Sequence, residues 1–214
     1  MGRCSDARER LVGTAVRLFH ERGYTAVSVA EICDAAGLKK GSFYHFFPSK
    51  LELVLEALDH YGQFYQRVVD EGLTPGKPAR VQLEGMFAAL RCNLEQRYEC
   101  EGKARGCPIG NLALELADRE EPIRHKIEII FAKLRNAFEG VIRRGVEKGE
   151  LAVDDPRGAA EALMAMVQGA MVLTKTANDP QVFARLVEVT LDGIAPRSHP
   201  NLAPTSSSTA PMTA

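Results

Sequence analysis

The sequence predicts an all-α protein, with an N-terminal three-helix helix-turn-helix head followed by a larger helical body. Three observations lead to this class. Apolar residues recur at helical spacing in nearly every segment, glycine or proline separates the segments, and no segment shows the alternation of a strand. The 214 residues are 45% apolar and 26% charged, as in ordinary globular proteins, and the length fits a small domain plus a larger one.

Two helices are predicted at the start of the chain. The first covers residues 6–22 and ends at Gly23. Its apolar stripe consists of Leu11, Ala15, Leu18 and Phe19. Ser28 is the expected N-cap of a second, short helix, because Glu31 follows three residues later and completes a capping box. Gly37 ends this second helix.

The segment GLKKGSFYHFFPSKLELV, residues 37–54, predicts a third helix over residues 39–46, which Pro48 prevents from continuing. The side chains expected to face inward are Leu38, Phe43, Phe46 and Phe47. Those expected on the outer face are Lys39, Lys40, Ser42, Tyr44 and His45. Two short helices joined by a glycine-containing turn form a helix-turn-helix, whose second helix enters the major groove of DNA. Lysines and hydroxyl groups suit base edges and phosphates, so the outer face is a candidate DNA-binding surface.

A long fourth helix is predicted to run to about residue 72, with Ser49 as its N-cap and Glu52 three residues later. Lys50 lies in its first turn, where free backbone N–H groups favour a phosphate. The head is also more basic than the rest of the chain. Residues 1–50 hold eight Lys/Arg and five Asp/Glu, whereas the whole chain has a net charge of −1. This asymmetry indicates that the head meets an anionic partner.

The segment AVRLFHERGYTAVSVAEICDAAGLKKGSFYHFFPSKLELV, residues 15–54, resembles the DNA-binding head of the TetR family of ligand-responsive transcriptional repressors. The resemblance implies a homodimer that binds a palindromic operator in double-stranded DNA and a small-molecule inducer in its body. By match to the family's pattern, Ser28 and Lys50 would hold phosphates. The residues that would contact DNA through the recognition helix are Lys39, Lys40, Ser42, Tyr44 and His45.

The chain is therefore expected to divide into a helix-turn-helix domain at residues 1–50, linked from residue 49 by the fourth helix, and a ligand-binding and dimerisation domain at residues 51–195. Residues 196–214 are rich in Pro, Ser, Thr and Ala, which predicts a disordered tail. The later helices of the body are predicted at residues 79–99, 108–117, 122–148, 157–177 and 180–194. The segment ELADREEP, residues 115–122, is interpreted as a solvated helix end.

The last two predicted helices are candidates for the dimer interface. They carry small residues, which let helices approach closely, and methionines, which adapt to a partner surface. The predicted interface residues are Leu163, Met164, Val167, Met171, Leu186 and Val189. The alternative is that these residues only close the core of their own chain.

The segment RGCPIGNLALELA, residues 105–117, contains the candidate sensor of the body, Cys107. A position at a helix N-terminus lowers the pKa of a thiol, and Arg105 adds a favourable charge. Cys107 is therefore a candidate for sensing oxidants or capturing an electrophilic inducer, and the alternative is a small packed residue. Asn111 and Tyr98 are candidate polar groups of an inducer pocket.

The leading hypothesis is a transcriptional repressor that is not an enzyme and needs no cofactor. The alternatives are a helical enzyme or thiol-reactive protein using Cys107, and a helical protein-interaction adaptor. Repression is the usual mode of the family, although the sequence also allows activation. His20, His60 and His125 are too scattered to suggest a metal site. No N-terminal apolar core resembles a signal peptide, and no stretch approaches the roughly 20 apolar residues of a membrane span. The five cysteines are an odd number and lack CxxC spacing, so a cytoplasmic protein with free thiols is expected.

Overall fold

The structure is a computed structural model that describes the backbone of residues 2–194 and the side chains from residue 6 onward. This part of the chain folds into nine helices and contains no strand, which confirms the predicted all-α class. The helices are α1 (Gly2–Arg22), α2 (Val29–Ala35), α3 (Lys40–Phe46), α4 (Lys50–Gly72), α5 (Ala79–Glu101), α6 (Pro108–Leu116), α7 (Glu121–Glu147), α8 (Pro156–Ala177) and α9 (Gln181–Gly193). The predicted disordered tail at residues 196–214 lies outside the described residues.

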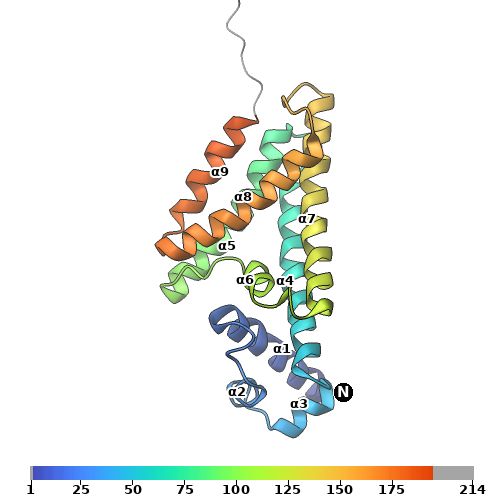
Figure 1. Cartoon of the computed structure of the whole chain (residues 1–214), viewed down its shortest axis with the longest axis vertical. Helices are drawn as coiled ribbons and strands as arrows, with labels where there is room; N and C mark the ends of the chain where they lie inside the picture. The colour runs from blue at the N-terminus through green and yellow to red at the C-terminus, as the bar shows by residue number, and fades with distance from the viewer. Residues whose placement is uncertain (1, 195–214) are drawn as a thin grey trace, which may run out of the picture.

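Helices α1, α2 and α3 form a compact head at one end of the molecule (Figure 1). Ser28 caps α2 as predicted, because its side chain accepts from the Glu31 N–H and the Glu31 carboxylate accepts from the Ser28 N–H. The turns after α1 and α2 need left-handed backbone, with φ of 83° at Gly23 and 64° at Gly37, which glycine adopts without steric cost. These local signals end α1 and α2, and α3 follows at the outer end of the head (Figure 1).

Helix α4 connects the head to the body as one continuous rod (Figure 1). Its first turns bury Leu53, Val54 and Ala57, and α4 packs on α1 in the head. Its later turns bury Tyr61 and Tyr65, and α4 packs on α5 and α7 in the body. Helix α4 therefore joins the core of the head to the core of the body.

Helices α7, α8 and α9 form the outer layers of the body, with α8 crossing α7 obliquely and α9 lying along α8 (Figure 1). The apolar stripe of α7 is buried from Ile127 to Ile142, except that Phe131 is only half-buried. Helix α6 lies between the head and the body and contacts both α1 and α4. None of the described helices combines the length and apolarity needed to cross a bilayer.

The predicted helix boundaries differ from the observed ones by a few residues. The largest difference is at the start, where α1 begins at Gly2 and not at residue 6. At its C-terminus α5 continues to Glu101, because Gly102 supplies the left-handed cap that ends the helix. Such shifts are common, since helix ends are set by cap geometry more than by the apolar pattern.

Candidate nucleic-acid interface and ligand cavity

The outer face of α3 carries the side chains that the sequence placed there. Lys39, Lys40, Tyr44 and His45 are exposed, and Ser42 is half-buried. Tyr44 is 60% exposed, which is unusual for a large aromatic side chain unless a partner covers it. The predicted orientation of the helix is therefore confirmed, and its DNA contacts remain a prediction.

The inner face of α3 holds this short helix in place. A seven-residue helix is not stable alone, so its position depends on tertiary packing. Phe43 and Phe47 are buried, with ring centroids 5.9 Å apart, and the Arg8 guanidinium lies 5.3 Å from the Phe47 ring centroid. Leu38 and Phe46 are half-buried against the same core. The aromatic rings thus anchor α3 from behind while its polar side faces outward.

Gly41 lies in the first turn of α3, on the exposed side. A Cβ atom at this position would meet no atom of the chain within 4 Å. Its backbone does not have a positive φ either. Nothing in the packing of this chain therefore requires glycine here, which leaves close approach of the α3 backbone to a partner as a reason for it.

Ser28 is exposed beside this face, but its hydroxyl is engaged in the helix cap. Its Oγ accepts from the Glu31 N–H at 3.2 Å and donates to the Glu31 carboxylate at 2.8 Å. The Arg22 guanidinium donates to the same carboxylate at 2.8 Å. Hydrogen bonds from the Ser28 backbone and side chain, followed by Arg22, lower the pKa of Glu31 to about 2. The predicted phosphate contact of Ser28 would have to be made in competition with this cap.

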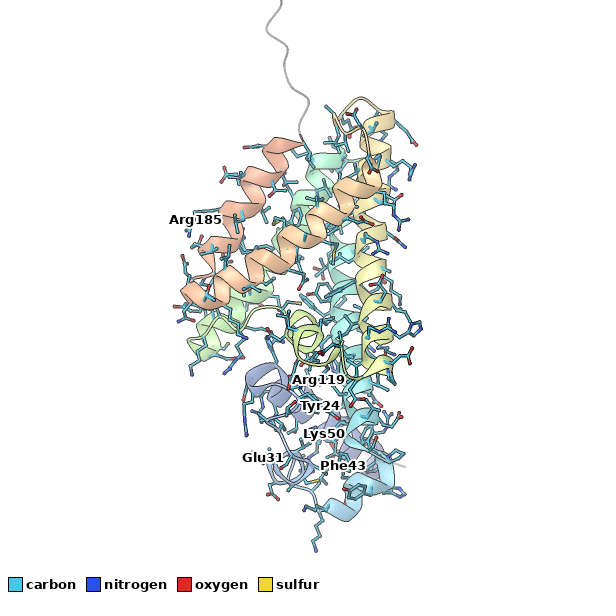
Figure 2. The ribbon with its side chains drawn as sticks, in the orientation of Figure 1. Tyr24, Glu31, Phe43, Lys50, Arg119 and Arg185 are labelled. Carbon is cyan, nitrogen blue, oxygen red and sulfur yellow. The ribbon has the colours of Figure 1, made fainter. Side chains whose placement is uncertain are left out.

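Lys50, the other predicted phosphate ligand, is half-buried in the head. Its ammonium donates to the Tyr24 carbonyl at 2.7 Å and the Val27 carbonyl at 2.6 Å, and it lies 4.0 Å from the centroid of the Tyr24 ring. Figure 2 shows Lys50 and Tyr24 beside each other in the head. Partial burial lowers the pKa of Lys50 from its usual value. Lys50 therefore ties α4 to the α1–α2 loop, and the predicted phosphate contact of Lys50 would have to compete with these hydrogen bonds.

Glu115 of α6, in the body, forms hydrogen bonds to the same loop. Its carboxylate accepts from the Tyr24 N–H at 2.9 Å and the Thr25 N–H at 2.6 Å. Burial alone would raise the pKa of Glu115, but the hydrogen bonds from Thr25 and Tyr24 and the nearby Lys50 charge lower it. The interpretation of residues 115–122 as a solvated helix end is wrong for Glu115, because this side chain is half-buried and its carboxylate binds two backbone N–H groups of the α1–α2 loop.

Cys107 lies at the N-cap of α6, as predicted, and its sulfur accepts from the Gly110 N–H at 3.2 Å. The Tyr65 hydroxyl lies 2.9 Å from the sulfur, within hydrogen-bond distance. The thiol is buried, and burial raises its pKa even though Tyr65 and Gly110 favour the thiolate. The expected lowering of the pKa is therefore wrong, because desolvation outweighs the helix terminus. Arg105 is paired with Glu101 instead.

Two cavities meet at Cys107. The first, of about 160 Å³, is bounded by α1, α4, α5, the loop before α6 and Met171 of α8. The second, of about 270 Å³, is an apolar hollow between α6, α7 and α8 that includes Asn111. Asn111 donates to the Arg105 carbonyl at 3.0 Å and accepts from the Lys175 ammonium at 3.2 Å. Tyr98 lines neither cavity, which removes it from the candidate ligand site.

His20, which seemed uninformative in the sequence, joins the head to the first cavity. It is buried at the end of α1, and its Nε2 lies 3.1 Å from the Gly106 carbonyl, which can only accept. The proton is therefore on Nε2, and Nδ1 accepts from Arg97 Nη1 at 2.8 Å. Burial and then the Arg97 charge lower the pKa of His20 to about 4. No group of residues in the described part of the chain has the arrangement of a metal site.

The predicted dimer residues fall into two groups. Leu163, Met164, Val167 and Met171 are buried in the core of their own chain, which is the alternative that the sequence left open. Leu186 is half-buried and Val189 is 71% exposed on α9. The opposite face of α8 is exposed and consists of small or apolar residues, namely Ala162, Ala165, Gly169, Val172 and Leu173, with half-buried Met166 beside them.

Two models of known protein families match this chain. Residues 11–57 match the model of bacterial regulatory proteins of the tetR family, and residues 82–190 match the model of the tetracyclin repressor-like C-terminal domain. The chain belongs to the TetR family. The resemblance noted in residues 15–54 is thus confirmed and extends through most of the body.

Known members of the TetR family with similar sequences are transcriptional regulators. The transcriptional repressor DhaR of Mycobacterium sp. is 29% identical over 88% of this chain and 92% of that protein. The transcriptional regulator AcuR of Cereibacter sphaeroides is 29% identical over 79% of this chain and 76% of that protein. A TetR-family regulator of Agrobacterium tumefaciens has the same fold, with a TM-score of 0.81, 24% identity, and coverage of 90% of this chain and 100% of that one. The chain is a DNA-binding transcriptional regulator.

Proposed function

We propose that the protein is a homodimeric repressor that binds a palindromic operator and is released from it by a small molecule. The observation that carries this proposal is the outer face of α3, where Lys39, Lys40 and Tyr44 are exposed on a helix that buried phenylalanines hold rigidly. Lysines and tyrosines on a recognition helix suit phosphates and base edges. Two such heads bind adjacent major grooves when their recognition helices lie roughly 34–36 Å apart.

The exposed face of α8 supports the dimer. Val172 and Leu173 are 47% and 52% exposed, and no atom lies within 4 Å of a Cβ built at Gly169. Small residues of this kind let two copies of a helix approach closely, and a two-fold axis brings identical faces together. Val189 on the neighbouring α9 extends the apolar surface. The proposed interface is therefore the outer face of α8 together with α9, and not the four buried residues that the sequence suggested.

Release from DNA requires that the inducer and the operator prefer different arrangements of the heads. The cavity beside Cys107 is bounded by α1 and α4, which both continue into the head. His20 and Glu115 add two hydrogen-bonded links between the head and the body. A ligand that displaces the cavity wall would therefore shift the head through α4 and through these links.

An electrophilic inducer is a second form of the same proposal, supported by the position of Cys107 on the wall of both cavities. Because burial raises the pKa of the thiol, reaction with a general thiol reagent should be slow at neutral pH. If electrophiles act through Cys107, Cys107→Ser should abolish their release of operator DNA in a mobility-shift assay. Full release from Cys107→Ser would remove the electrophilic form and leave non-covalent induction.

The DNA-binding face is tested with Tyr44→Ala on an operator obtained by selection from random duplexes. Removing one contact on the recognition helix should weaken operator binding by about 1–3 kcal/mol, which is roughly 5- to 150-fold. Tyr98→Ala, in the body and outside both cavities, is the matched control and should bind normally. Unchanged operator affinity for Tyr44→Ala, with an intact dimer, would contradict the assigned face.

A further inference from the structure

The cavity of about 160 Å³ has an uneven distribution of charge. Its wall contains no aspartate or glutamate, although several basic side chains contribute to it. The basic residues are His20, His60, Arg67, Arg97 and Arg105. A cavity bounded by cations and lacking carboxylates favours a ligand that carries negative charge.

Arg97 and Arg67 are basic residues of this wall that pair with no carboxylate among the described residues, and of the two only Arg97 is half-buried. Arg105 is paired with Glu101 and also donates to the Glu21 carbonyl at 3.3 Å. Arg97, in contrast, has no carboxylate within ion-pair distance among the described residues. Its guanidinium donates one hydrogen bond to a described side chain, that of His20, at Nδ1. A guanidinium has five N–H donors, so most of those on Arg97 remain free for a ligand.

His20 fixes the direction of Arg97 without competing for its charge. Since Nε2 of His20 donates to the Gly106 carbonyl, Nδ1 has to accept, and the guanidinium is held by a neutral acceptor. A carboxylate is a much stronger acceptor for a guanidinium than an imidazole nitrogen, and the two can form a bidentate pair. Arg97 is thus oriented at the cavity by a neutral acceptor, and the nearby Glu101 carboxylate, which also feels the Arg97 charge, is paired with Arg105.

The remaining wall sets the size and shape of the ligand. The apolar side chains of the wall are Val16, Phe64, Leu90, Leu94 and Met171. A protein cavity of about 150 Å³ holds one benzene molecule, so about 160 Å³ leaves room for a ligand of that size. The wall therefore suits a small molecule with one charged end and one apolar end.

We propose that this cavity binds a small organic monocarboxylate, with the carboxylate on Arg97 and the hydrocarbon part against Phe64, Leu90 and Leu94. The inference names the ligand class of the inducer and in that respect rests on the proposed function. Binding of the acid draws Arg97 toward the ligand and weakens its hydrogen bond to His20 at the end of α1. The same contact that recognises the ligand thereby alters a link between the body and the head.

The test is calorimetric titration of the full-length protein with benzoate and with benzamide, which has the same size and no charge. Benzoate should bind at least about tenfold more tightly than benzamide, because only the acid pairs with Arg97. Butyrate and butyramide are a second pair of acid and amide, with a slimmer hydrocarbon part than benzoate and benzamide. Equal affinity for acid and amide in both pairs, or no binding of either acid, overturns the proposal.

The residue assignment is tested with Arg97→Gln and with Arg91→Gln. Both arginines belong to α5, but Arg91 is exposed, pairs with Glu95 and lies outside this cavity. Arg97→Gln should lower the affinity for the acid by about tenfold and remove the difference between acid and amide, whereas Arg91→Gln should change neither. An unchanged preference for the acid in folded Arg97→Gln overturns the assignment, and thermal unfolding of each variant verifies the fold.

Different measurements test the repressor function and the carboxylate site. Operator binding is measured without any ligand, so its absence counts against the repressor and leaves the carboxylate site intact. If the operator binds and the acid shows no preference over the amide, the repressor stands and the carboxylate site is rejected. If Arg97→Lys, which keeps the charge, retains the preference while Arg97→Gln loses it, recognition of the anion is established.

Discussion

The outer faces of α3 and α8 are both left uncovered by their own chain, yet they differ in chemistry. The α3 face presents lysines, hydroxyl groups and one aromatic ring above a buried layer of phenylalanines. The α8 face presents alanine, glycine, valine and leucine. Desolvating the first face is costly unless a charged partner replaces water, whereas desolvating the second is favourable in itself. The kind of side chain that a helix leaves exposed thus indicates whether nucleic acid or a second protein surface covers it.

The largest expected effect is that of acid, because His20 joins α1 of the head, which carries α3, to the body, which carries α8. Since the pKa of His20 falls from 6.5 in the unfolded chain to about 4 in the folded one, the unfolded chain takes up a proton first as pH decreases. The contribution of His20 is complete above pH 6.5 and is lost as pH falls toward 4, by up to about 3 kcal/mol. Urea unfolding between these pH values measures the loss.

The control for the acid prediction is His20→Gln, which stays polar but has no proton to gain. Its free energy of unfolding should lack the part of the pH dependence between pH 6.5 and pH 4 that His20 supplies. A wild-type slope that persists in His20→Gln would show that other groups control acid sensitivity. The junction would then not depend on neutral His20.

The next largest effect should come from a charge placed on the α8 face. Val172→Glu puts two carboxylates near a two-fold axis and should weaken the dimer by about 2 kcal/mol or more, roughly thirtyfold. Val81→Glu is the matched control, since Val81 is 45% exposed on α5 and Val172 is 47% exposed. Sedimentation equilibrium distinguishes the two variants. A Val172→Glu protein that dimerises as tightly as Val81→Glu would refute the proposed interface.

The smallest expected effect concerns Gly41 on the α3 face, where one substitution should change stability and operator binding in opposite directions. Gly41→Ala should stabilise the free protein by up to about 1 kcal/mol, since alanine has the higher helix propensity and open space surrounds this position. Operator affinity should fall, because the added methyl group separates the α3 backbone from DNA. Thermal unfolding and a mobility-shift titration of the same variant measure both quantities. Lower stability together with unchanged affinity would mean that the chain itself needs this glycine.

The head was predictable from sequence because its signals are local. Ser28 and Glu31 cap α2, Gly37 supplies a left-handed turn, and Pro48 follows α3 directly. Each signal acts within a few residues, and the aromatic spacing around Phe43 decides which side of α3 faces inward. The outward orientation of the candidate DNA-binding residues followed from these features alone.

The body was less predictable because its important contacts join distant segments. Glu115 binds the loop at Tyr24, and His20 binds Gly106, so neither partner can be recognised from its neighbours in sequence. The pKa of Cys107 depends on burial under Tyr65, which a position at a helix N-terminus does not reveal. In α8 both sides are apolar or small, and periodicity cannot tell which side the chain covers.

The internal pairing of the head has a consequence for how salt affects operator occupancy. Arg8, Arg17 and Arg22 each pair with a glutamate, and Lys50 is bound to backbone carbonyls. Among the cations of the head whose side chains are described, Lys39 and Lys40 are exposed and lack such partners. Two heads would then neutralise about four phosphates through them, which gives a slope of roughly −4 for log affinity against log salt through counterion release. A regulator of this kind would hold its operator through changes of ionic strength that displace more heavily charged DNA-binding proteins.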